Sequence, residues 1–355
     1  MKNSKVKNAI NRFINIKTYR VYDQIKDLFD EYLNEVLPEQ KKLNGHKHFR
    51  GKEIEEKILS LIEEDERVLL IQDQDFLRRN IGMKAALVEF EEVVLRSLDN
   101  YEASIQQDRS GNNIGIYSIQ HGLVKCVDKA LDNKTASAQQ NCNGDNIGMF
   151  CAKGGLEYLV IKALDNEKAS IQQNCNGENI GMYAAYQKLE KATLKALDNK
   201  EASIQLNESK WNIGMIAAKN KMESCVLKAL DNHEASLQQD GWGDNIGICA
   251  AQQGMENCVL KALDNNEASL QLDFARFNIG MYAIRSGLVD ASLKAIQNKE
   301  VRNKIENFDE ECYELAKTHS KEKDLKNDPI IQALEEIQRQ ENNNFEDDES
   351  FSVLE

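Results

Sequence analysis

The chain has 355 residues, of which 41% are hydrophobic and 29% are charged. This composition supplies enough apolar side chains for a core and excludes a wholly disordered chain. A net charge of −14 argues against non-specific binding to nucleic acid, and no apolar stretch has the length of a membrane-spanning helix. The eight cysteines lack disulfide-type spacing, which is typical of free thiols in a reducing compartment.

Residues 1–40 begin with a basic stretch, because residues 1–20 carry six basic side chains and no acid. Apolar residues from Val6 to Val36 recur with helical spacing and stop just ahead of Pro38. We therefore expect residues 1–40 to form an N-terminal helical segment of two helices that pack on the first repeat. The alternative is a small catalytic or targeting module within residues 1–74, but this segment shows no catalytic constellation.

Residues 41–74 hold a turn signal at Asn44-Gly45 and a helical pattern from Ile54 to Ile62. Counted back from the repeats that follow, the segment starts in phase with them and later falls one residue out of phase. The terminal units of a repeat array need a polar outer face. We therefore interpret 41–74 as a degenerate N-terminal capping repeat.

Residues 75–299 contain a tripeptide that recurs without insertion or deletion. Asn-Ile-Gly begins at 80, 113, 146, 179, 212, 245 and 278, so that every interval is 33 residues. Ala-Leu-Asp-Asn and Ala-Ser followed by Ile or Leu and then Gln recur in the same phase in most copies. This fixed period predicts seven copies of one unit, each of which stacks on its neighbours.

The unit at 174–206 illustrates the local structure that the sequence predicts. Asn179 is a good N-cap for a short first helix, which ends at a turn where four other units hold glycine, the residue suited to positive φ. A second helix, with a helical apolar stripe, runs from Leu189 to Leu197. Asp198-Asn199 ends this helix, and an extended stretch at Ala202–Gln205 leads into a polar turn.

A helix, a turn, a second helix and a hairpin-like loop within 33 residues resemble the ankyrin repeat. The segment Asn141–Asp145 matches the opening of the family pattern, and Asn146–Ala152 occupies its Thr-Pro-Leu-His segment. Every unit lacks the family's Pro and replaces His by another residue, mostly Met or Ile, so that asparagine capping takes the place of the Thr–His arrangement. The resemblance implies an all-α, ankyrin-type solenoid of helix-turn-helix and hairpin-loop repeats with helical caps.

Two further segments follow the repeats. Continuing the phase places a first helix at Glu311–Ala316 and a second at Ile330–Gln340. We therefore expect 300–340 to form a degenerate C-terminal capping repeat. Residues 341–355 carry six acids and no base, which predicts a disordered acidic tail.

The reactive residues show no catalytic pattern, so the sequence predicts a protein that is not an enzyme and that has no cofactor and no metal. His46 and His48 are close in sequence and are interpreted as part of a surface loop. Cys142 and Cys175 share a tip position in adjacent units, too far apart for one zinc ion or a relaxed disulfide. Three cysteines at one position of the second helix are interpreted as core residues: Cys126, Cys225 and Cys258.

Two further patterns are interpreted as structural. Gln pairs such as Gln106-Gln107 and Gln172-Gln173 predict hydrogen-bond ladders between repeats. Four aromatic residues share one first-helix position and are interpreted as packing residues: Tyr117, Phe150, Tyr183 and Tyr282.

The ankyrin resemblance places a partner-binding surface on the hairpin tips and on the outer face of the first helices, which together form a concave surface. The side chains at these positions vary from unit to unit while the frame stays fixed. Aromatic and arginine side chains on such a surface are typical of binding hot spots. The residues assigned to it are Trp211, Trp242, Phe274, Phe277, Tyr186, Lys219, Gln252, Gln253 and Arg285.

We therefore expect a non-enzymatic scaffold that binds a partner protein, and a protein of a host cell is one candidate for this partner. We expect it to bind neither nucleic acid nor a membrane. The alternative is an acidic, immunity-like inhibitor that masks a basic toxin or nuclease, and salt-sensitive affinity would distinguish it. We expect a monomer in the cytoplasm, either of the producing cell or of a host into which the protein is delivered.

Overall fold

The computed structural model describes the backbone of residues 2–38, 49–72, 77–303, 308–319 and 328–351, and the side chains within 16–38, 50–72, 77–303, 311–318 and 328–340. These residues form helices and no strand, which confirms the predicted all-α class. Contacts divide the chain into unit 1, Met1–Cys175, and unit 2, Asn176–Glu355. In the described part of the chain, no helix has the length and apolar character needed to cross a bilayer.

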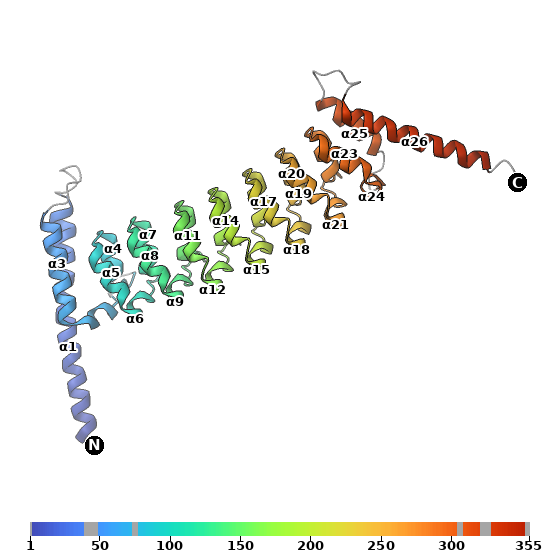
Figure 1. Ribbon diagram of the computed structural model, residues 1–355. Coiled ribbons are helices and arrows are strands. Elements are labelled where there is room, and N and C mark those ends of the chain that lie inside the picture. The colour runs from blue at the N-terminus through green and yellow to red at the C-terminus, as the bar shows by residue number, and fades with distance from the viewer. Residues whose placement is uncertain (1, 39–48, 73–76, 304–307, 320–327, 352–355) are drawn as a thin grey trace. The chain divides into compact units, whose positions relative to one another are not determined.

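Each copy of the repeat folds into a first, a second and a third helix, and successive copies lie side by side within each unit (Figure 1). The repeats of unit 1 consist of α4 (Ile81–Leu87), α5 (Glu91–Asp99) and α6 (Tyr101–Ser104), then α7 (Ile114–Gln120), α8 (Val124–Asp132) and α9 (Lys134–Ser137), then α10 (Ile147–Lys153), α11 (Glu157–Ala163) and α12 (Glu167–Ser170). The repeats of unit 2 consist of α13 (Ile180–Tyr186), α14 (Glu190–Ala196) and α15 (Lys200–Ile204), then α16 (Ile213–Lys219), α17 (Glu223–Ala229) and α18 (His233–Leu237), then α19 (Ile246–Gln252), α20 (Glu256–Ala262) and α21 (Asn266–Ser269), then α22 (Ile279–Arg285), α23 (Val289–Gln297) and α24 (Lys299–Asn303).

The third helix corrects the sequence analysis, which predicts an extended stretch at Ala202–Gln205. Here α15 is a short helix with Asn199 as its N-cap. The side-chain oxygen of Asn199 accepts hydrogen bonds from the backbone N–H groups of Glu201 at 3.1 Å and Ala202 at 3.2 Å. The asparagine that ends the second helix therefore also starts the third, because its side chain satisfies the free amides of the next turn.

A buried asparagine in each repeat caps the first helix and ties it to the third. Oδ1 of Asn245 accepts a hydrogen bond from the backbone N–H of Ile248 at 2.9 Å. Its Nδ2 donates to the backbone oxygen of Ala268 at 3.0 Å and to Oε1 of Gln271 at 2.9 Å. This geometry confirms the predicted asparagine cap and adds two hydrogen bonds to it.

The glutamine pairs connect adjacent repeats, as the sequence predicts. Nε2 of Gln271 donates to the backbone oxygen of Leu237 in the preceding repeat at 2.7 Å. The second glutamine of a pair reaches the following repeat, since Nε2 of Gln107 donates to the backbone oxygen of Gln140 at 3.0 Å. The polar atoms between repeats are thereby satisfied by side chains that recur with the period.

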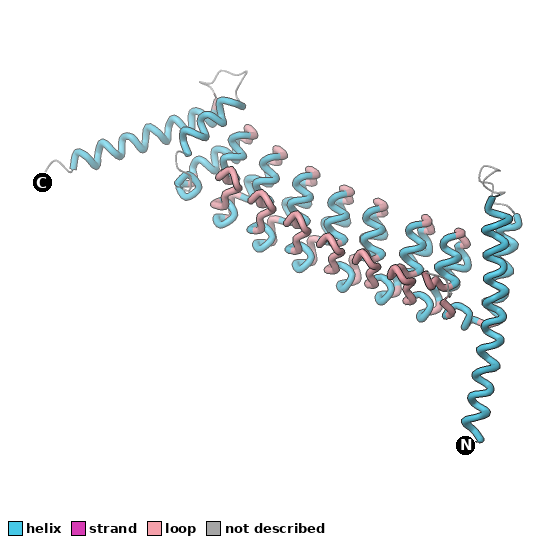
Figure 2. Tube along the Cα trace, turned by 180° about the vertical axis from the view of Figure 1, so that it is seen from behind, coloured by secondary structure: helices cyan, strands magenta, loops and turns pink. Residues whose placement is uncertain are grey.

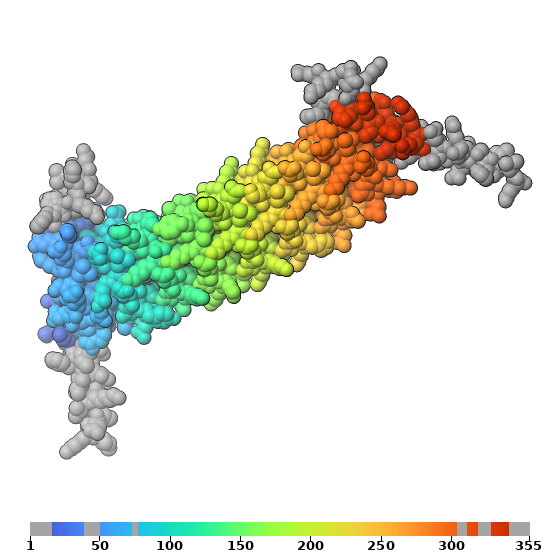
Figure 3. Space-filling model, in the orientation of Figure 1, coloured from blue at the N-terminus to red at the C-terminus, as the bar shows by residue number. Residues whose placement is uncertain are grey.

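The glycine of Asn-Ile-Gly leaves room for the isoleucine of the next repeat. A Cβ added to Gly247 would lie 2.5 Å from Cδ1 of Ile279 and 2.7 Å from Cβ of Ala262. Equivalent contacts surround Gly115 in unit 1 and Gly214 in unit 2. Successive repeats of unit 2 therefore pack closely against one another. They form a continuous surface in the space-filling view (Figure 3).

The turn between the first and second helices has the predicted left-handed conformation. The φ angle is 72° at Gly122 and 75° at Gly254, and it is 57° at Lys188, which replaces glycine there. Glycine adopts this conformation without the steric cost that a Cβ imposes.

The cysteines that the sequence assigns to the core are buried, and burial raises the pKa of the Cys126, Cys225 and Cys258 thiols to about 12. Cys142 and Cys175 are exposed. The four first-helix aromatics are also packed as predicted: Tyr117 and Tyr282 are buried, and Phe150 and Tyr183 are half-buried.

The N-terminal part of unit 1 differs from the prediction of two helices at 1–40. One helix, α1 (Lys2–Glu31), continues directly into the π-helical turn η1 (Tyr32–Val36), because no glycine or proline interrupts it. It packs against α3 (Phe49–Glu64), which is followed by the 3-10 helix η2 (Glu66–Leu70). The ring of Tyr32 lies 4.7 Å from that of Phe90, so this segment packs on the first repeat as expected.

The C-terminal part of unit 2 consists of α25 (Phe308–His319) and α26 (Pro329–Phe351), at the positions expected for a capping repeat. Cys312, Ile330 and Leu334 form one buried cluster with Ile284 and Ile296 of the last repeat. The helix α26 continues to Phe351 and so reaches into 341–355, for which the sequence predicts a disordered tail.

Candidate interaction surface

In the six repeats whose tips are described, from 108–112 to 273–277, the tip is a five-residue turn ahead of the capping asparagine. These tips follow one another along one side of the helices in each unit (Figure 2). In the tip at 240–244, the backbone N–H of Asp240 donates to the oxygen of Asp244 at 2.9 Å. Oδ1 of Asp240 accepts from the N–H groups of Trp242 at 2.8 Å and Asp244 at 3.0 Å. These hydrogen bonds fix the backbone of the tip. The side chains that do not take part in them can therefore differ between repeats.

Trp211 is held against the next tip. Its Nε1 donates to Oδ2 of Asp240 at 3.1 Å, and Nζ of Lys219 lies 3.8 Å from the centre of its ring. The same Lys219 nitrogen is 3.6 Å from Oδ2 of Asp240, whose side chain is fully buried. The indole is half-buried. Trp211 and Lys219 therefore stabilise the tip, and a substitution of either would disturb it.

Trp242 and Phe274 are the exposed aromatic residues of this surface. Their relative exposures are 71% and 76%, the highest of the large hydrophobic side chains in the described residues. They lie on adjacent tips, which are joined by a hydrogen bond from the backbone N–H of Phe274 to the oxygen of Trp242 at 3.0 Å. The predicted surface thus contains two adjacent apolar side chains that the fold leaves uncovered.

The side chain of Phe277 packs within the fold. It is half-buried and packs against the C-terminal core cluster. Its ring lies 5.8 Å from that of Tyr282, whose hydroxyl donates to Oδ2 of Asp273 at 2.6 Å. Phe277 therefore links the last tip to the core.

The remaining predicted residues lie at the ends of the first helices. The hydroxyl of the half-buried Tyr186 accepts a hydrogen bond from Nδ2 of Asn207 at 3.0 Å, and burial raises the pKa of this phenol to about 12. Nε2 of Gln252 donates to Oδ2 of Asp244 at 2.9 Å. Gln253 is half-buried, and Arg285 is exposed. A hollow of about 360 Å³ is lined by Gln252, Tyr282, Arg285 and Ser286.

Two exposed cations at the tips, Lys210 and Arg276, are not among the residues predicted from the sequence. Each occupies the fourth position of its tip with φ of 60° and 66°, where Gly243 stands in the tip between them. The signal was present in the sequence, because the phase aligns these residues with glycines. We call Lys210, Trp242, Phe274 and Arg276 the tip patch.

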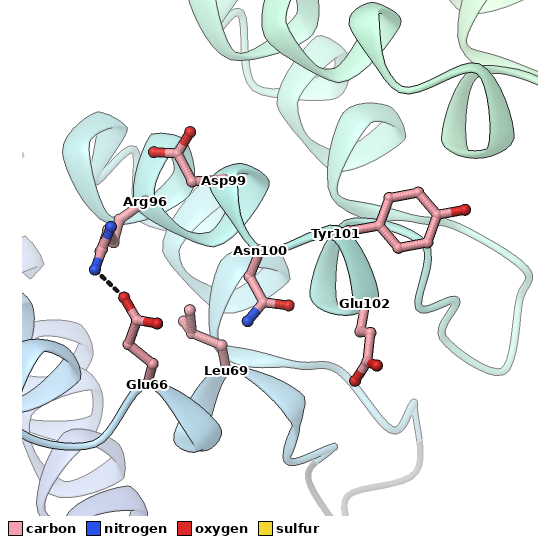
Figure 4. A pocket seen from close by; sticks show the side chains of 7 residues that line it. All are labelled: Glu66, Leu69, Arg96, Asp99, Asn100, Tyr101 and Glu102. Atoms are coloured by element: carbon pink, nitrogen blue, oxygen red, sulfur yellow. Dashed lines mark hydrogen bonds and ion pairs between the residues drawn. The ribbon is translucent and has the colours of Figure 1, made fainter.

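A hollow in unit 1 is lined by charged groups that have partners within the fold or face solvent. It measures about 420 Å³, and an ion pair between Arg96 and Glu66 closes one side of it (Figure 4). The side chain of Asn100 in its wall caps α6. Its charged groups thus have structural partners or face solvent.

The described residues contain no group of three or more His, Cys, Asp or Glu side chains placed to hold a metal ion. His46 and His48 lie outside the described residues. Comparison with models of known protein families finds no match, and comparison with curated proteins finds no match either.

Proposed function

We propose that this protein is a non-enzymatic interaction protein of the ankyrin type, which binds a partner protein through the tip patch. The period of 33 residues, the paired first and second helices and the hydrogen-bonded tips support this assignment. The observation that carries the proposal is the 71% and 76% exposure of Trp242 and Phe274 on adjacent tips.

Exposed aromatic side chains of this kind have a physical reason to bind. Large, rigid rings lose little conformational entropy on association and bury much apolar surface, which is why aromatic residues dominate interface hot spots. The hydrogen-bonded tips hold both backbones in place before binding. A partner therefore meets a preorganised surface.

The surface charges argue against the alternative of an acidic inhibitor that masks a basic partner. Among the described residues of the unit 2 tips and first-helix ends, the exposed charges are five cations and the carboxylate of Glu208. A basic partner would be repelled by this face. We also propose a monomer in the cytoplasm, which agrees with eight cysteines that are all free thiols.

Replacement of both exposed aromatics tests the proposal. The variant Trp242→Ala/Phe274→Ala is expected to bind the protein that the intact chain captures from its source cells about tenfold more weakly or worse. Its thermal midpoint should stay that of the wild type, because both side chains are exposed. Quantitative capture at graded bait concentrations, with circular dichroism of each variant, gives both values.

The matched control removes two exposed aromatics that lie away from the tips. Tyr101 and Tyr158 are 58% and 54% exposed on α6 and α11. The variant Tyr101→Ala/Tyr158→Ala should capture the partner as the wild type does. Retention of the partner by the tip variant, or equal loss by both variants, would contradict the proposed function.

A further inference from the structure

The tip patch combines two exposed aromatic rings with two exposed cations in a regular order. Lys210, Gly243 and Arg276 each donate their backbone N–H to the first residue of their own tip, at 2.8, 3.1 and 3.0 Å, and so occupy equivalent positions in three successive repeats. Trp242 directly precedes the central one of these positions. The two cations therefore flank the exposed indole along the row of tips.

The two tip cations, Lys210 and Arg276, differ from three lysines of the second helices in their electrostatic partners. Lys228, Lys261 and Lys294 each form an ion pair with an aspartate of the preceding repeat. In the described part of the chain, Lys210 and Arg276 form no ion pair, and the same holds for Arg285. The positive charges of Lys210 and Arg276 are thus available to a partner, whereas those of the three second-helix lysines are neutralised within the fold.

We infer that the tip patch binds an extended acidic segment of a partner protein, with a large apolar side chain between its acids. This inference rests on the proposed function and names the chemistry of the partner. Carboxylates would pair with Lys210 and Arg276, and the apolar side chain would pack on Trp242 and Phe274.

The spacing of the repeats sets the spacing of such a segment. Packed helices of adjacent repeats lie about 10 Å apart, so Lys210 and Arg276 are separated by about 20 Å. An extended chain advances about 3.3 Å per residue, which places the two acidic positions about six residues apart. The apolar side chain falls near the middle of this interval, opposite Trp242.

A protein segment fits this surface better than a nucleic acid or a membrane does. The whole chain carries a net charge of −14, which repels a phosphate backbone or an anionic bilayer at long range. Two cations and two aromatic rings provide a short, local complement to a few carboxylates. They do not form the extended basic surface that polyanion binding needs.

The repeat itself supplies a variant that removes the charge without disturbing the fold. Other tips hold Gly111, Gly144, Gly177 and Gly243 at the positions of Lys210 and Arg276, all with positive φ. Glycine adopts this conformation freely, so Lys210→Gly/Arg276→Gly should keep the thermal midpoint within about 4 °C of the wild type. The matched control is Lys188→Gly/Lys221→Gly, which removes the same charge from left-handed positions at the other end of the first helices, where other repeats hold glycine.

In the experiment, peptides that bind the immobilised full chain are selected from a random library. The peptides are about twelve residues long, which is enough for the expected six-residue spacing. The selected peptides should be enriched in Asp and Glu on both sides of a large apolar residue. They should bind the tip variant about tenfold more weakly and the control variant as the wild type. Oligothymidine and phosphatidylserine vesicles, titrated against the same proteins, should bind more weakly than these peptides.

Selected peptides that are neutral or basic, or that bind the tip variant as tightly as the wild type, would overturn the inference. Tighter binding of oligothymidine or vesicles would overturn it as well. These outcomes are separate from a failure of the proposed function. If Trp242→Ala/Phe274→Ala loses the captured protein while acidic peptides are not selected, the protein-binding role stands and the partner chemistry is wrong.

Discussion

Replacement of Asn245 by alanine is expected to lower the free energy of unfolding by about 3 kcal/mol, the sum of a lost helix cap and of buried groups left without partners. Asn245 is fully buried and makes three hydrogen bonds, to Ile248, Ala268 and Gln271. An alanine makes none of these hydrogen bonds. Urea unfolding of the full chain, followed by circular dichroism, measures the change.

A neighbouring asparagine provides the control. The side chain of Asn266 is exposed in the first turn of α21. Asn266→Ala should change the free energy of unfolding by no more than about 0.5 kcal/mol. Asn245→Asp keeps the acceptor that caps the helix and loses both donors, so its effect should also be large. Equal effects of Asn245→Ala and Asn266→Ala would contradict the role assigned to the buried asparagine.

Replacement of Gly247 by alanine is expected to lower the free energy of unfolding by about 2 kcal/mol or more, because the added methyl group overpacks the contact between two repeats. Its Cβ would lie 2.5 Å from Cδ1 of Ile279 and 2.7 Å from Cβ of Ala262. This cost exceeds the gain of about 1 kcal/mol that alanine brings in helix propensity. The same unfolding measurement detects the difference.

Two further variants separate overpacking from backbone strain. A Cβ at Gly254, where φ is 75°, meets no atom within 4 Å, so Gly254→Ala should cost only about 1 kcal/mol of conformational strain. Ile279→Val removes the methyl group that is closest to the new Cβ at position 247. The double variant Gly247→Ala/Ile279→Val should therefore be less destabilised than the sum of the two single variants predicts. Simple additivity would show that the clash is not the cause.

The fold was predictable where the signal is local and repeated. The phase of Asn-Ile-Gly locates all first helices, and the cap at Asn179 follows from the chemistry of the side chain alone. The third helix was missed because four or five residues give no readable periodicity, and Asn199 was interpreted only as an end. The role of the glycine was missed because the atoms that require it belong to the next repeat.

The candidate surface was predictable in position and not in exposure. The phase of the repeats places Trp211, Trp242 and Phe274 at the tips, where the structure has them. Whether a tip side chain faces solvent depends on the neighbouring repeat: Trp211 is covered because Asp240 and Lys219 meet its ring. Trp242, two positions earlier in its own tip, stays 71% exposed. Contacts between repeats, which a single unit of sequence does not contain, therefore decide which aromatic residues remain available.

A photo-reactive residue at the tip patch tests the central claim most directly. Benzoylphenylalanine is placed at position 242 of the full chain, and in a second protein at the position of Tyr158, which is also exposed. After irradiation in the source cells, the account predicts a discrete cross-link to one partner from position 242 and none from position 158. The absence of any cross-link from position 242, or the same cross-link from both positions, would contradict the claim that the tips of unit 2 bind a partner protein.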